Sequence, residues 1–309
     1  MTDSIVADTA TRLFRDLCDP QTILRAKDDS WKARAWSALE DAGLPLAWVP
    51  DDLGGSGADL ADGFAVLRES GRFAVPLPVA ETLLAGWLLA QAGISSPAGA
   101  MSCTMRSGKP ASLSASGRLT GHLRHIPFGR DAQHLALLAK QDAGDWAIVL
   151  VPTSEARISH GTSIAGDPLD TIDLEGVRPS HVKPAPPGIH DRLMLMGATA
   201  RAMQMAGALE AILDIAVSYA NERVAFERPI AKFQAVQHNL ARLAGEVAAS
   251  VAAAGSAVDA ISTGSPSPLW GGARGGGNPN VDCSGIPPSL SLPHEGGGDP
   301  RHNREETRC

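Results

Sequence analysis

The chain has 309 residues, of which 44% are hydrophobic, and this is enough material for two or three domains with apolar cores. Its 27 Lys and Arg residues against 34 Asp and Glu residues give a net charge of −7. The sequence also contains no basic stripe with interleaved aromatic residues, so composition and charge argue against a nucleic-acid surface.

Nothing near the N-terminus resembles an export signal. The first 14 residues include Asp3 and Asp8 and lack a basic start followed by an apolar run. Leu83 to Ala92, the longest apolar stretch in the first third, is too short to cross a bilayer.

The four cysteines are far apart and have no zinc-ligand spacing: Cys18, Cys103, Cys283 and Cys309. We expect a cytoplasmic protein with reduced thiols, no membrane span and no metal site.

Apolar residues recur at helical spacing through the first 94 residues. Leu83, Leu84, Trp87 and Leu88 are one example, and Gly- and Pro-containing breaks at 43–45, 51–57 and 76–78 separate such segments. The pattern predicts an N-terminal α-helical domain over residues 1–94, with three to five helices.

The pattern changes to short apolar runs over residues 95–190. Leu135 to Ala139, Trp146 to Val151 and Thr171 to Leu174 have the length of strands. Residues 140–145 contain the Asp and Gly that favour a hairpin connection between the first two. We predict a small central β domain over 95–190.

Helical spacing returns after residue 191. One long pattern runs from Arg192 to Arg223, and a second starts near Phe233. The second carries one apolar face, made of Val236, Leu240, Leu243 and Val247. The sequence therefore predicts an α+β fold whose third part, residues 191–262, is a partial C-terminal helical bundle.

Residues 263–309 contain 10 Gly and 7 Pro among 47 residues, which exceeds the content of a packed domain. Runs such as Gly271 to Gly277 look like translated repeat DNA. We predict a disordered tail that follows a disrupted reading frame.

Residues Tyr219 to His238, which read YANERVAFERPIAKFQAVQH, combine fixed charged, aromatic, proline and amide positions. This stretch resembles the signature of flavin-dependent acyl-CoA dehydrogenases, Arg-x-x-Phe-Gly-Arg-Pro-Ile-x-x-Phe-Gln-x-x-Gln. The resemblance continues more loosely through Ala206 to Leu209, Pro50 to Gly57 and Glu69 to Arg72, and covers roughly residues 10 to 262. The chain is identified as a C-terminally truncated member of that family.

The resemblance implies a helical domain, a β domain and a helical bundle, the order predicted above. It also implies FAD as cofactor, acyl-CoA as substrate, and α,β-dehydrogenation of the thioester. Arg223 would meet the FAD pyrophosphate of a neighbouring subunit through its bidentate guanidinium, in a homo-oligomer or a mixed oligomer. Phe226, Ile230, Phe233 and Gln234 would also contact the cofactor.

The sequence departs from the family at three places. Glu227 replaces a glycine and puts a carboxylate beside the expected phosphate site. The usual catalytic glutamate lies in a part of the bundle beyond this chain's helical pattern, and the alternative position aligns with Gly197. No Thr-Glu-x-x-x-Gly-Ser segment for the flavin ring is found between Met101 and Ala115. We therefore assign no catalytic residue, and three readings remain open: an impaired dehydrogenase, a non-catalytic partner of a full-length homologue, and a decayed gene product.

Overall fold

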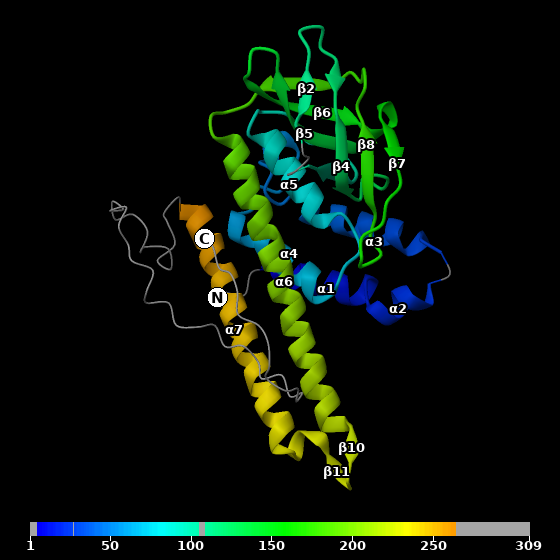
Figure 1. Cartoon of the computed structure of the whole chain (residues 1–309), viewed down its shortest axis with the longest axis vertical. Helices are drawn as coiled ribbons and strands as arrows, with labels where there is room; N and C mark the ends of the chain where they lie inside the picture. The colour runs from blue at the N-terminus through cyan, green and yellow to red at the C-terminus, as the bar shows by residue number, and fades with distance from the viewer. Residues whose placement is uncertain (1–4, 27, 105–108, 264–309) are drawn as a thin grey trace, which may run out of the picture. The chain divides into compact units, whose positions relative to one another are not determined.

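The computed structural model describes residues 5–26, 28–104 and 109–263, and the predicted tail lies outside them apart from Thr263. Helices come first, then strands, then helices again, which confirms the predicted α+β class (Figure 1). The helices are α1 (Ile5–Leu17), α2 (Pro20–Arg25), α3 (Ser30–Asp41), α4 (Leu60–Arg72), α5 (Val79–Ala90), α6 (Ile189–Glu222) and α7 (Gln234–Thr263).

Two sheets form the central part of the chain. The strands of this part are β1 (Met101–Cys103), β2 (Ala111–Leu113), β3 (Leu119–Thr120), β4 (His122–Pro127), β5 (His134–Gln141), β6 (Trp146–Pro152), β7 (Arg157–Ser159), β8 (Leu169–Asp173) and β9 (His181–Pro184). One sheet has the order β3-β2-β5-β6-β9, with β1 also paired to β5, and the other has the order β4-β8-β7. β5 and β6 form the predicted antiparallel hairpin.

Strand β5 is buried on both faces, which explains its unbroken apolar run. Leu135 and Leu137 pack in the core between the two sheets, whereas Ala136 and Leu138 belong to the core shared with the helices. Successive side chains of a strand point to opposite faces, so one strand serves both cores. The two-sheet part is thereby joined to α5, which covers its outer face.

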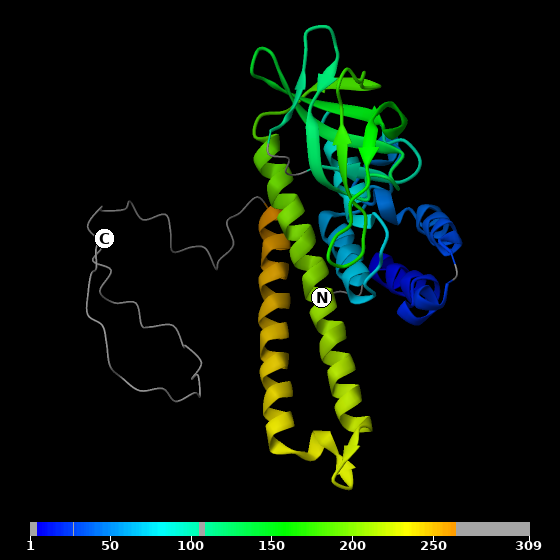
Figure 2. The ribbon, with the colours of Figure 1, turned by 45° about the vertical axis from the view of Figure 1, so that its right-hand side comes forward.

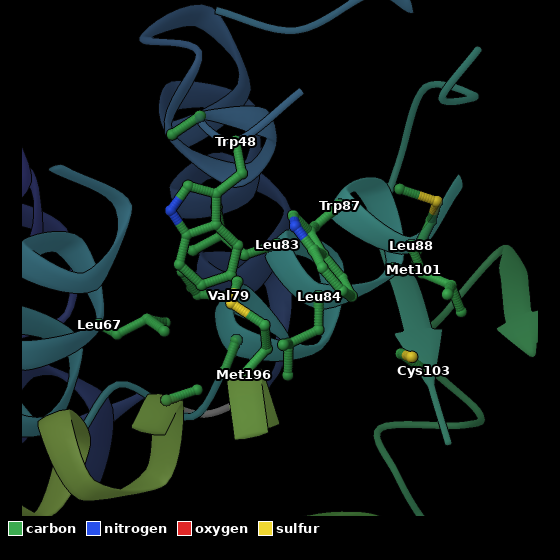
Figure 3. Packing of buried hydrophobic residues seen from close by; sticks show 14 of the residues in the cluster. Trp48, Leu67, Val79, Leu83, Leu84, Trp87, Leu88, Met101, Cys103 and Met196 are labelled. Atoms are coloured by element: carbon green, nitrogen blue, oxygen red, sulfur yellow. The ribbon is translucent and has the colours of Figure 1, made fainter. Parts of the chain in front are cut away.

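Helix α5 lies at the centre of the helical core. Leu83, Leu84 and Leu88 are fully buried on it, and Met196 of α6 reaches into the same cluster (Figure 3). At the start of α5, Thr82 Oγ1 accepts from the Met101 N–H at 3.0 Å and donates to the Met101 carbonyl at 3.1 Å. These bonds fix β1 against α5 where the chain leaves the helices for the sheet.

Helices α4 and α6 cross at two glycines. A Cβ on Gly207 would lie 1.9 Å from the Arg68 carbonyl oxygen, and one on Gly71 would lie 2.0 Å from the Gln204 carbonyl oxygen. Backbone contact of this kind leaves no room for any side chain. The two loosely similar motifs of the sequence, around residues 69–72 and 206–209, therefore pack directly on each other.

Two ion pairs flank this crossing of α4 and α6. Arg68 Nε donates to Glu210 Oε2 at 2.8 Å, and Arg72 Nη2 donates to Asp214 Oδ2 at 2.6 Å. Both acidic residues lie on α6 and both arginines on α4, so the pairs fix the register between the helices.

Beyond this crossing, α6 and α7 continue as a long antiparallel hairpin (Figure 2). Large apolar side chains of α6 are exposed here, including Met205, Ile212, Ile215 and Tyr219. Helix α7 is, by length and composition, apolar enough to cross a membrane, and 17% of its most apolar window is buried. The prediction that the chain has no membrane span was based on Leu83 to Ala92 and did not consider α7. The composition of α7 also fits a helix from the interior of a larger bundle.

A buried carboxylate ties the β7–β8 connection to the loop after β4. Asp170 is 0% exposed and accepts from the Arg130 N–H at 2.8 Å, from Arg130 Nε at 3.0 Å and from the Gly161 N–H at 3.0 Å. Burial alone would raise the pKa of Asp170, but these hydrogen bonds and the Arg130 charge hold it below its usual value. The three segments are held in one arrangement by a single side chain.

Candidate functional site

The signature residues form the tip of the α6–α7 hairpin. After α6 ends at Glu222, strands β10 (Val224–Ala225) and β11 (Arg228–Pro229) pair through a two-residue turn. The turn residues Phe226 and Glu227 have φ values of 51° and 66°. Positive φ at both positions defines a type I′ turn, in which glycine is strongly preferred. The positive φ at position 227 therefore explains why the family has a glycine there. The sequence motif alone does not show this reason.

The tip brings the predicted cofactor residues together. Arg223 is exposed just after α6, and its carbonyl accepts from the Ile230 N–H at 2.8 Å. The rings of Phe226 and Phe233 meet edge to face with centroids 6.2 Å apart, and Phe226 is 90% exposed. Gln234 is exposed at the first position of α7. All five residues thus lie within residues 223–234, between the end of α6 and the first residue of α7.

One neighbour of these residues was not assigned from the sequence. The Arg228 guanidinium carbon lies 4.2 Å from the centroid of the Phe233 ring, within the range of a cation–π contact. Arg228 is the second arginine of the signature, so the motif itself contained the signal. Arg223, Arg228 and Lys232 give the tip three cations, and Glu222 and Glu227 give it two carboxylates. The excess of positive charge favours an anionic ligand, although Glu227 would repel it.

The tip is distant from the chain's own β domain. Helix α6 has 34 residues and begins directly after β9, so its ends are about 50 Å apart at 1.5 Å per residue. Figures 1 and 2 show β10 and β11 at the opposite end of α6 from the two sheets. A dinucleotide that touches Arg223 is therefore out of reach of this chain's own strands.

A second region of interest is the part of the helical core where α5 contacts both α6 and β1. Gly197 is buried on α6, and Cys103 of β1 is buried in the cluster that also contains Met196 of α6. Burial, with a smaller contribution from Glu81, raises the pKa of the Cys103 thiol to about 12, so this thiol is protonated near neutral pH. The segment without the expected flavin motif follows β1, and its residues 105–108 lie outside the described part of the chain.

Comparison with known proteins agrees with this arrangement. Residues 190–274 match the family described as acyl-CoA dehydrogenase, C-terminal domain. The acyl-CoA dehydrogenase IpdE2 of Mycobacterium tuberculosis is 30% identical over 245 residues, which are 73% of this chain and 65% of that protein. Residues 190–274 belong to this C-terminal domain family of the acyl-CoA dehydrogenases. The chain spans less than two thirds of the length of this relative.

Solved acyl-CoA dehydrogenase structures share the fold. The Tcur3481-Tcur3483 steroid ACAD variant has a TM-score of 0.72 at 24% identity, and the matched region covers 84% of this chain and 78% of the chain of that variant. The ChsE4-ChsE5 complex of Mycobacterium tuberculosis has a TM-score of 0.69 at 22% identity, and the matched region covers 84% of this chain and 81% of the matched chain of the complex. At these identities the likeness shows the fold alone. The family match includes the whole of α7.

Replacing Glu227 tests the two effects of this residue separately. We expect Glu227→Gly to stabilise the protein by up to about 1 kcal/mol, because it relieves a left-handed conformation, and to strengthen FAD binding, because it removes a carboxylate. Glu227→Ala removes the charge but keeps the strain, so it should strengthen binding only. Urea unfolding and FAD titration measure the two effects. Equal stability of both variants would contradict the conformational explanation.

Proposed function

We propose that this chain is one subunit of an FAD-dependent acyl-CoA dehydrogenase assembly that acts on an acyl-CoA thioester by α,β-dehydrogenation. The observation that carries the proposal is the hairpin tip, where Arg223, Phe226, Ile230, Phe233 and Gln234 gather on exposed or half-buried backbone. Residues of these types, so far from the chain's own sheets, are suited to a cofactor bound mainly by another chain.

The chemistry of the tip fits FAD. Arg223 offers a planar fork of N–H donors for a pyrophosphate, and the Gln234 amide can both donate and accept. The edge-to-face pair of Phe226 and Phe233 gives an apolar wall beside these polar groups. When bound, FAD supplies the acceptor for the β-hydrogen, while the protein binds and orients the thioester.

The second chain can be a copy of this one or a related acyl-CoA dehydrogenase. Gly197 favours the related chain, because the position where some family members carry their base has no side chain here. The exposed apolar residues of α6 and the largely exposed α7 also give a second chain a surface to cover. On this reading the chain contributes its hairpin tip to a cofactor that is bound mainly by the partner, and the partner removes the α-proton.

The experiment is purification of the full chain alone and together with a full-length acyl-CoA dehydrogenase from the same organism. Size-exclusion chromatography reports the assembly, and absorbance of the yellow flavin reports the cofactor. We expect a mixed oligomer that contains FAD, with turnover of acyl-CoA only in the mixture. Colourless protein that binds no added FAD in either preparation would overturn the proposal and favour a decayed gene product.

A further inference from the structure

One face of α6 carries an open stripe of apolar side chains. We call this stripe the α6 seam, and it consists of Met205, Ala208, Ile212, Ile215 and Tyr219. Its four large side chains are between 51% and 68% exposed in the part of the chain that the structure describes. Helix α4 contacts a different face of α6, at Gly207 and Glu210. The seam is therefore left uncovered by the neighbouring helix that crosses α6 most closely.

The spacing of the seam residues is that of a coiled coil. They follow one another at intervals of three and four residues in turn, so they occupy alternating a and d positions on one face of the helix. Met205, Ile212 and Tyr219 recur every seven residues at the a positions. A helix face that meets only water has no need of large apolar residues at this spacing. The pattern indicates that the seam packs against a second helix.

The seam also carries no charge. Between Ala202 and Asn221 the charged residues of α6 are Glu210 and Asp214, and both pair with arginines of α4. This stretch contains no Lys or Arg, whereas helices that bind a membrane surface are rich in basic residues beside their apolar face. The seam therefore fits another uncharged, apolar helix face better than it fits a membrane.

We propose that the seam packs against the same seam of a second copy of this chain, with the two α6 helices antiparallel. A two-fold axis between residues 213 and 214 places Ile212 opposite Ile215 of the second copy. The same axis places Tyr219 opposite Ala208 of the second copy, so that a large side chain meets a small one. A parallel pair would instead put Tyr219 on Tyr219 and Ala208 on Ala208, which crowds one layer and leaves a void in another.

This contact is separate from the proposed cofactor residues. The seam ends at Tyr219, before the hairpin tip begins at Arg223. The inference therefore does not rest on the proposed function, and two copies that are joined at the seam can each offer a hairpin tip to a related chain.

Sedimentation of the full chain alone, without FAD or a partner, tests the proposal over a range of protein concentrations. We expect the wild type to be a dimer at micromolar concentration. Ile215→Glu places a carboxylate in the seam opposite Ile212 and should weaken dimerisation about 100-fold or more. Val217→Glu is the matched control, because Val217 is also an exposed apolar residue of α6 but lies off the seam. It should dimerise like the wild type.

Mixing two variants tests the antiparallel arrangement. Ile212→Lys alone should be a monomer, like Ile215→Glu. An equal mixture of the two should dimerise, because the introduced lysine and carboxylate then lie opposite each other. Rescue by mixing also shows that both variants are folded.

Four results would overturn the proposal: a monomeric wild type, undiminished dimerisation of Ile215→Glu, equal losses in Ile215→Glu and Val217→Glu, or a mixture that stays monomeric. A wild type that is monomeric in solution and sediments with phosphatidylserine vesicles would also overturn it, and would assign the seam to a membrane surface.

Discussion

Arg223→Met should weaken FAD binding by the assembled protein about 10- to 100-fold, the largest effect that we expect of any single change at the hairpin tip. The guanidinium can donate to a pyrophosphate, and the loss of one hydrogen bond to a charged group, roughly 1.5 to 3 kcal/mol, corresponds to about this change in affinity. Arg223 is exposed, and among the described residues its hydrogen bonds are made by its backbone, so the change should leave the free energy of unfolding unaffected. FAD titration of the assembly, followed by flavin fluorescence, measures the loss.

Arg242→Met is the matched control for this variant, because Arg242 is an exposed arginine on the same hairpin, within α7. It should bind FAD like the wild type. Equal FAD affinities for Arg223→Met and the wild type would remove Arg223 from the cofactor site, and a similar loss in both variants would indicate a general effect of charge.

Asp170→Ala should lower the free energy of unfolding by about 3 to 5 kcal/mol, since it leaves Arg130 without its carboxylate partner and the Gly161 N–H without its acceptor. Asp173→Ala, on the same strand but half-buried, should cost much less. Urea unfolding at neutral pH measures the difference. Similar losses for the two variants would show that the buried network around Asp170 contributes little.

The effect of Asp170 should also depend on pH. Its pKa in the folded protein is lowered, so its contribution is present above the unfolded-state value of about 3.9 and is lost as the pH falls below that value. The stability difference between wild type and Asp170→Ala should therefore shrink in acid. A difference that stays constant from neutral pH to about pH 3 would contradict this assignment.

Local patterns predicted the class of the fold and most of its elements. The helical spacing of Leu83, Leu84 and Leu88 became α5, and the apolar run from Leu135 to Ala139 became the centre of β5. Such periodicities depend on residues close in sequence, so they can be read without the structure. The predicted cofactor residues also came from one local motif, and the structure places them on one hairpin tip. Their contact with FAD remains a prediction.

The features that sequence reasoning missed depend on contacts between distant residues or on backbone conformation. Glu81 and Arg201 are 120 residues apart, and no periodicity indicates that they pair. The contact of Gly71 with the backbone of α6 is equally non-local. Glu227 looked like a purely electrostatic departure, because the positive φ of the turn is visible only in the folded chain. The amount of exposed apolar surface on α7 likewise follows from packing rather than composition.

Hydrogen exchange at residues 223–234, measured by mass spectrometry, tests the sharing of one cofactor site between two chains most directly. The full chain is compared alone, with FAD, with a full-length acyl-CoA dehydrogenase from the same organism, and with both. We predict marked slowing of exchange at the hairpin tip only when the partner and FAD are present together. Exchange at the tip that is unchanged in the complete mixture, or slowed to the same extent by FAD alone, would contradict a cofactor site shared between two chains.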